Sequence, residues 1–286
     1  MIKTLILLAL WLVTLTGYSQ KTESKGDNQK SPFVLGVVDN LYSNVLGEKR
    51  ILNVYLPEGY SQSDTVRYPV IYLLDGSADE DFIHIAGLVQ FNSFEWVRRV
   101  PKSIVVGIAT VDRRRDFTSP TSVAGDKKQF PTSGQSQKFI TFIENELQPY
   151  IRKNYKTTDS STIIGQSFGG LLASEILLAK PYLFSNYIIV SPSIWWNIAA
   201  LLKREKTALQ AHTGKLEVYI ACGKEGPSPG EAFRVMESDA ILLAEWLKAT
   251  RNTHVDVVFD YLPGENHATI LHQAVNNAFV NFYTTK

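Results

Sequence analysis

The chain is poor in cysteine and carries no excess charge of either sign. Cys222 is the only cysteine among 286 residues, which excludes an internal disulfide. Its place in the apolar stretch KLEVYIACG favours a small core residue over a chemical role. Lysine and arginine total 29 against 28 aspartates and glutamates, a formal charge of +1. Such a balance creates no broad field that would attract nucleic acid or an anionic membrane surface.

Long hydrophobic runs are also scarce, and the longest lies near the N-terminus. Lys3 precedes an apolar run over residues 5–13, and small residues follow up to Ser19. This pattern is typical of an export signal, so residues 1–19 are predicted to be a signal peptide. The alternative, an uncleaved anchor helix, needs about 20 apolar residues. The polar residues 20–31 are predicted to be a flexible leader. We therefore expect an exported protein, periplasmic or secreted, with no membrane span after signal removal.

From residue 32 onward, short apolar segments alternate with helical patterns. Continuous runs of Ile and Val suit strands that are covered on both faces, and the first two segments suit an antiparallel pair. Eight strands are predicted, at residues 33–43, 49–57, 68–76, 103–111, 161–167, 186–193, 215–223 and 254–263. Helical periodicity occupies residues 136–155, 231–250 and the C-terminal segment. The sequence predicts one α/β domain, residues 32–286, with a mostly parallel eight-stranded sheet between helices.

The stretch IIGQSFGG sets Ser167 between two glycines where a predicted strand ends and a helix begins. A G-x-S-x-G elbow holds a nucleophilic serine on such a strained turn. GPSPG, around Ser228, fits the same pattern. The residue after the serine must donate its backbone N–H to the developing oxyanion, and Phe168 has that N–H whereas Pro229 does not. Ser167 is therefore the predicted nucleophile, and GPSPG is predicted to be a turn.

A serine nucleophile needs an imidazole to accept its proton. In the α/β-hydrolase order this base comes last in the chain, which excludes His84 and His212. His254 and His272 are expected to face solvent. His267 lies in the loop between the last strand and the last helix, so it is the predicted base.

The acid that orients the imidazole should follow the strand before last. Glu225 lies there, with Glu231 and Asp239 as rivals and a solvated loop carboxylate as the alternative reading. A second oxyanion donor is expected after the first parallel strand, from the backbone N–H of Gly76 or Ser77.

The chain resembles the putative-esterase family of α/β hydrolases, which includes siderophore trilactone esterases, feruloyl esterases, S-formylglutathione hydrolases and mycolyltransferases. The resemblance covers nearly the whole mature chain and is closest to the siderophore esterase branch. It rests on YSNVLGEKRILNVYLPEGY, YPVIYLLDG, VVGIATVDRRRDFTSP, IIGQSFGGLLA, VSPSIWWN and PGENHATI. It implies Ser167 and His267 as catalytic residues. Because the acid is missing or displaced in parts of that branch, a Ser–His–Glu225 triad and a Ser–His pair both stay open.

The resemblance implies candidate substrate-binding roles for two further stretches. Arg113, Arg114 and Arg115 of DRRRDFTSP are candidates to hold a carboxylate or catecholate oxygen, and the alternative is a solvated charge run. Trp195 and Trp196 are candidate walls of an aromatic or acyl pocket, and the alternative is core packing.

No metal or cofactor is predicted. His267 and His272 are five positions apart and lack a carboxylate at ligand spacing, and no Gly-rich phosphate loop occurs. We expect a serine esterase that forms an acyl-enzyme with a small-molecule ester of siderophore or aryl type. The alternatives are an acyltransferase with the same triad and a catalytically idle binding protein on a hydrolase fold. The sequence leaves the acyl and alcohol parts of the substrate open, as well as the oligomeric state.

Overall fold

The computed structural model describes residues 30–63, 65–229 and 234–284. The predicted signal peptide and most of the predicted leader lie outside the described residues. Contacts divide the chain into Met1–Val34 and Leu35–Lys286, and every helix and strand below belongs to the second unit. None of the helices in the described ranges is long and apolar enough to cross a membrane.

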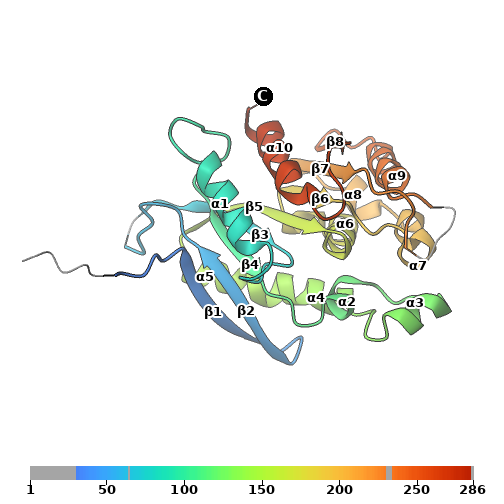
Figure 1. Cartoon of the computed structure of the whole chain (residues 1–286), viewed down its shortest axis with the longest axis horizontal. Helices are drawn as coiled ribbons and strands as arrows, with labels where there is room; N and C mark the ends of the chain where they lie inside the picture. Colours follow the sequence, from blue (N-terminus) through green and yellow to red (C-terminus); the bar gives the residue numbers. More distant parts are fainter. Residues whose placement is uncertain (1–29, 64, 230–233, 285–286) are drawn as a thin grey trace, which may run out of the picture. The chain divides into compact units, whose positions relative to one another are not determined.

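A twisted eight-stranded sheet runs through this unit in the order β1-β2-β4-β3-β5-β6-β7-β8 (Figure 1). β2 pairs antiparallel with β1 and with β4, and all the other pairs are parallel. The bounds of the strands are β1 Gly36–Ser43, β2 Glu48–Tyr55, β3 Tyr68–Leu73, β4 Ile104–Ile108, β5 Thr157–Gln166, β6 Asn186–Val190, β7 Leu216–Gly223 and β8 Val255–Leu262. The predicted strand count and fold class are confirmed.

Helices cover both faces of the sheet. On one face, α1 and α10 pack over a core that includes Ile71 and Ile188, and on the other α4, α5, α6 and α9 pack over a larger core (Figure 1). These helices are α1 Phe82–Asn92, α4 Ser136–Phe142, α5 Gln148–Asn154, α6 Phe168–Ala179, α9 Met236–Lys248 and α10 Ile270–Thr284. Shorter elements are α2 Arg113–Phe117, α3 Ala124–Gln129, α7 Trp196–Ala199, α8 Thr207–Gln210 and the turns Ile143–Leu147, Pro181–Leu183 and Ala200–Lys203.

Two predicted helices differ in detail from the observed ones. The helix predicted over residues 136–155 forms as α4 and α5, joined by the π-helical turn Ile143–Leu147. The helix predicted from residue 231 begins only at Met236, because Val235 pairs with Pro227 in an isolated antiparallel bridge.

β5 passes directly into α6, and the two backbones cross closely at this turn. A Cβ added to Gly165 would lie 2.4 Å from the carbonyl oxygen of Gly169, a distance that real contacts do not reach. Glycine is therefore required at this position by a close approach of two backbones. In α1, by contrast, a Cβ on Gly87 would meet open space.

We expect Gly165→Ala to destabilise the protein by about 1–3 kcal/mol, because the added methyl group overpacks the crossing. Gly87→Ala is the matched control and should stabilise α1 by about 0.5–1 kcal/mol, since alanine has the higher helix propensity. Urea denaturation followed by circular dichroism measures both changes. Equal stability of Gly165→Ala and the parent protein would contradict the observed crossing.

Candidate active site

Ser167 occupies the turn between β5 and α6 in a strained backbone conformation. Its φ of 60° and ψ of −120° are unfavourable for a residue with a Cβ. Three backbone hydrogen bonds hold it: its N–H donates to Val190 O (3.0 Å), and its carbonyl oxygen accepts from Leu171 N (2.9 Å) and Ser193 N (3.0 Å). The neighbouring elements thus fix the serine where β5 ends.

The hydroxyl of Ser167 lies beside two groups that bear on its chemistry. Its Oγ is 3.3 Å from Oγ of Ser193, and either atom can donate. Phe168 is the first residue of α6, so its N–H has no acceptor within the helix. An N–H at a helix N-terminus stabilises negative charge. The predicted oxyanion donor is therefore in a suitable place.

His267 lies in the loop between β8 and α10 and contacts the predicted acid. Its Nδ1 is 2.7 Å from Oε2 of Glu225, and 46% of its side chain is exposed. With Nδ1 engaged, Nε2 is the nitrogen left to exchange a proton. The side-chain amide of Gln166 donates to the carbonyl oxygen of His267, which ties this loop to the residue before Ser167.

Glu225 is almost fully buried, with 3% of its side chain exposed. Ser191, directly after β6, donates a hydrogen bond from its hydroxyl to Oε1 of Glu225. The backbone N–H of Glu225 in turn donates to Oε1 of Glu237 (2.8 Å). Burial raises the pKa of Glu225, but the hydrogen bonds from His267 and Ser191 outweigh this effect and leave the pKa below its ordinary value. Glu225 is therefore a carboxylate at neutral pH.

The rival residues lie elsewhere or are paired with other groups. Asp239 is buried and forms an ion pair with Arg234, and Glu231 falls outside the described residues. His84 packs edge-on against His272, with ring centroids 5.3 Å apart. His267 is the histidine that the structure brings to Glu225.

Ser167 and His267 both border two cavities. The first, of about 360 Å³, is called the aromatic cavity; it is lined by Gln129, Phe130, Ser167, Phe168, Ser193, Trp195, Glu225, Pro227, Pro229, Met236 and His267. The second, of about 390 Å³, is called the acidic cavity; it is lined by Asp75, Glu80, Asp81, Arg113, Gln166, Ser167 and His267. A molecule that reaches the serine hydroxyl can extend into either cavity.

The two predicted tryptophans have different surroundings. Trp195 lines the aromatic cavity and packs against Phe168, with ring centroids 5.6 Å apart. Trp196 is buried behind it, and its indole N–H donates to Ser119 O (2.9 Å). Both tryptophans belong to the core, but only Trp195 lines the cavity and is placed to touch a ligand.

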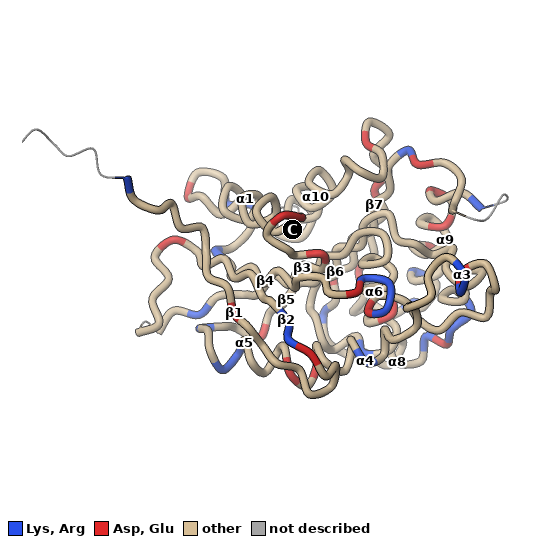
Figure 2. The backbone as a smooth tube through the Cα atoms, turned by 60° about the horizontal axis from the view of Figure 1, so that its bottom comes forward, with Lys and Arg blue, Asp and Glu red and all other residues tan. Residues whose placement is uncertain are grey.

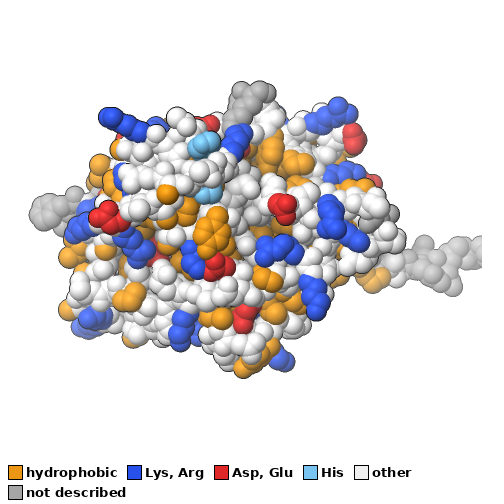
Figure 3. All heavy atoms as spheres, turned by 180° about the vertical axis from the view of Figure 1, so that it is seen from behind, with side chains coloured by type: hydrophobic (Ala, Val, Ile, Leu, Met, Phe, Trp, Pro, Cys, Tyr) orange, Lys and Arg blue, Asp and Glu red, His pale blue; other side chains and the backbone are white. Residues whose placement is uncertain are grey.

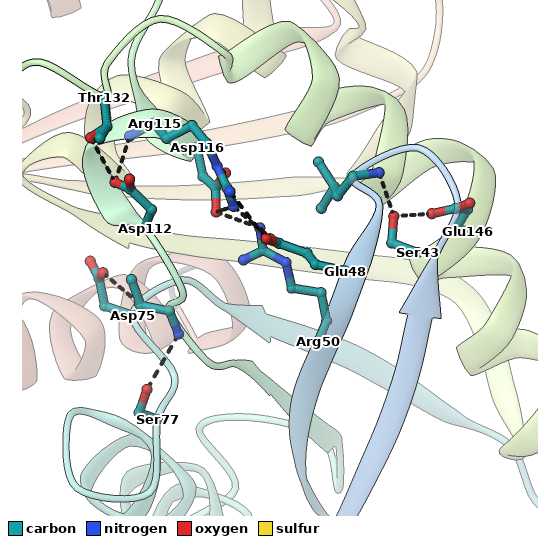
Figure 4. Close-up of polar contacts among 12 residues, drawn as sticks. Ser43, Glu48, Arg50, Asp75, Ser77, Asp112, Arg115, Asp116, Thr132 and Glu146 are labelled. Carbon is teal, nitrogen blue, oxygen red and sulfur yellow. Dashed lines mark hydrogen bonds and ion pairs between the residues drawn. The ribbon is translucent and has the colours of Figure 1, made fainter.

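The prediction that Gly76 donates to an oxyanion is wrong. Its N–H donates to Ile108 O (3.0 Å), and its carbonyl oxygen accepts from Asn53 Nδ2 (2.8 Å). A Cβ at this position would lie 2.4 Å from Cα of Gly107, so the glycine serves a close crossing with β4. The N–H of Ser77 stays a prediction, and the Ser77 hydroxyl accepts from Thr110 N (3.3 Å; Figure 4).

The prediction that Arg115 contacts substrate is also not supported by the geometry. Its guanidinium binds Glu48 and Asp116, beside the buried Arg50, and it borders neither cavity (Figure 4). This ion cluster joins β2 to α2. The carboxylates of Glu48 and Asp116 occupy the hydrogen-bonding fork that a ligand would need.

Arg113 does border the acidic cavity, but it is already engaged. Its Nε donates to Asp75 Oδ1 (2.8 Å) and its Nη2 donates to Gln166 O (3.0 Å). It also stacks over Phe168, 5.5 Å from the ring centroid. Its main contacts are thus with the loops around the serine.

Sequence reasoning missed several residues of the site. Ser191 and Ser193 belong to VSPS, directly after β6 at the same sheet edge as the elbow, and their position was a signal that could have been used. Glu80 and Asp81, in the segment between β3 and α1, line the same cavity as Ser167. Phe130 comes from the irregular segment after α3, and no sequence signal identifies it.

Comparison with known proteins shows which chains this one is similar to. Residues 43–273 match the model of the family described as "Putative esterase". The chain is 27% identical to ferri-bacillibactin esterase BesA of Bacillus subtilis over 274 residues, covering 91% of this chain and 94% of that protein. It is 25% identical to the siderophore triacetylfusarinine C esterase of Aspergillus fumigatus, covering 84% and 90% of the two chains. A crystal structure of an IroE-like serine hydrolase from Shewanella oneidensis superposes with a TM-score of 0.77 at 30% identity, covering 87% and 80%.

Proposed function

The chain belongs to the putative-esterase family of α/β hydrolases and is an ester hydrolase, and from that premise we propose that it forms an acyl-enzyme on Ser167. One observation carries this proposal: a strained serine at the start of α6 borders the same cavities as a histidine that is bound to a buried carboxylate. Serine, imidazole and carboxylate in this relation are the parts of an acyl-transfer site.

In the proposed mechanism, Ser167 Oγ attacks the ester carbonyl carbon while His267 Nε2 accepts the hydroxyl proton. Glu225 holds the imidazole through Nδ1 and stabilises the imidazolium that forms. The N–H groups of Phe168 and Ser77 receive the oxyanion. His267 then returns the proton to the leaving alcohol, and water releases the acyl group by the reverse sequence. The Ser167 hydroxyl must turn from Ser193 toward His267 for the first step.

We propose that the substrate is a small-molecule ester of siderophore or aryl type. The aromatic cavity supports this, because Phe130, Phe168 and Trp195 offer ring faces to an aromatic or acyl group. The names of two relatives, a ferri-bacillibactin esterase and a triacetylfusarinine C esterase, point in the same direction.

We also propose that the protein is exported, to the periplasm or beyond the cell. The proposal rests on the sequence of residues 1–19, in which a basic start precedes a short apolar run.

Ser167→Ala should reduce hydrolysis of p-nitrophenyl butyrate to the background rate, since removing such a serine costs about 10⁶-fold. Ser228→Ala is the matched control, because Ser228 sits in the second G-x-S-x-G pattern and its N–H is tied to Arg234 O. This control should retain near-parental activity. If Ser167→Ala kept more than about one hundredth of the activity, the serine mechanism would be refuted.

Glu225→Gln should lower kcat by about 10³- to 10⁴-fold with little change in KM, because the amide no longer holds the imidazole or stabilises its charge. Glu265→Gln removes the same charge from the His267 loop and leaves the partner of Nδ1 in place. Steady-state kinetics on both variants decide the role of the acid. A loss of only a few-fold in Glu225→Gln would indicate a Ser–His pair.

A further inference from the structure

The two cavities that meet at Ser167 and His267 differ in chemistry. The aromatic cavity is lined by three aromatic side chains and a single carboxylate, that of Glu225, whereas three carboxylates and one guanidinium line the acidic cavity. The two parts of an ester extend to opposite sides of the scissile bond. A substrate bound at Ser167 would therefore place chemically different groups in the two cavities.

The single guanidinium does not neutralise the acidic cavity. Arg113 is paired with Asp75 at 2.8 Å and is further held by the carbonyl oxygen of Gln166. Glu80 and Asp81 form no ion pair within the described part of the chain. Burial, followed by the neighbouring charges of Asp75 and Glu80, raises the pKa of Asp81 to about 6, so it is still mostly ionised at pH 7.

The carboxylate of Asp81 is not engaged in capping α1. Asp81 is the N-cap residue of α1, a position where an acidic group is favoured, yet its side chain makes no capping hydrogen bond. The carboxylate borders the acidic cavity instead. Its charge is thus available to a ligand.

Apart from Arg113, the basic groups near the site lie close to residues of the aromatic cavity. Arg114 is exposed and lies over the ring of Phe130, 5.4 Å from its centroid, and Phe130 lines the aromatic cavity. Lys127 and Lys128 lie in the last turn of α3, just before Phe130 (Figure 2). The formal charge of the chain is only +1, and both signs are interspersed over the face drawn in Figure 3. Selection by charge would therefore be local to the cavities.

We propose that Glu80 and Asp81 are specificity-determining residues, and that the acidic cavity selects esters whose part on that side is cationic over isosteric anionic esters. This inference rests on the proposed esterase function. A like-charged group in a cavity lined by carboxylates is repelled, whereas an ammonium group is attracted and its local concentration rises. Among iron-chelating esters, the same field would favour uncharged complexes over anionic ones.

Two series of aryl or alkyl esters test the proposal, one with the charge on the alcohol and one with the charge on the acyl group. Each series contains a trimethylammonium ester, its uncharged tert-butyl isostere and a carboxylate ester of similar size. In the series whose charged group lies in the acidic cavity, we expect kcat/KM for the cationic ester to exceed that for the anionic ester by about 10-fold or more. The ratio should fall as NaCl rises from 0.05 M to 0.5 M, because salt screens the interaction between the charged ester and the carboxylates.

The double variant Glu80→Gln/Asp81→Asn should bring the cation-to-anion ratio to within about 3-fold of unity. Because the Asp81 side chain makes no capping hydrogen bond, asparagine at this position should leave the start of α1 in place. Asp79→Asn is the matched control: it removes one charge from the same loop, but Asp79 is exposed and borders neither cavity, so the ratio should persist.

A ratio near unity in both series for the parent enzyme would overturn the proposal, and so would a preference that survives in the double variant. Hydrolysis of the uncharged esters by the parent enzyme, but not by Ser167→Ala, distinguishes this failure from failure of the esterase function. In that case the serine mechanism stands and only the charge selection is lost.

Discussion

The contact between His267 and Glu225 is the interaction on which the candidate site depends. It joins the loop after β8 to the loop after β7, and Ser191 links the same carboxylate to the end of β6. Since β5, β6, β7 and β8 are parallel neighbours, their carboxyl ends share one edge of the sheet. Ser167 and His267, one hundred positions apart, border the same cavities there because strand order, and not sequence distance, determines which loops meet.

Backbone strain at Ser167 is the second constraint, and contacts with the sheet hold the strained conformation in place. A positive φ at a serine costs about 1–3 kcal/mol, and the crossing of β5 and α6 allows only glycine at position 165. Hydrogen bonds from β6 and the segment after it hold the turn. The same turn presents the first N–H of α6 beside the serine hydroxyl, so one local geometry positions both a nucleophile and an oxyanion donor.

The sequence was sufficient to predict the strands and the elbow, because each follows from local patterns combined with the rule that parallel strands end at one edge. It named Glu225 as a candidate partner of His267 but left the rivals and a Ser–His pair open, and the contact between the two side chains comes from the structure. It was not sufficient for Gly76 and Arg115. A glycine can serve a turn or a close crossing, and Gly76 serves the crossing with β4, while the positive φ falls on Asp75. Arg115 is paired with Glu48, a residue of a distant strand that no local pattern connects to it.

Chemical trapping of the nucleophile tests the central claim most directly. The protein is treated with a fluorophosphonate, which reacts only with an activated serine, and the adduct is located by intact-mass and peptide mass spectrometry. The account predicts one adduct per chain, on the peptide that contains Ser167, and slow or absent labelling when His267 is replaced by alanine. Absence of any adduct in the folded protein, or an adduct on Ser228 instead, would contradict it.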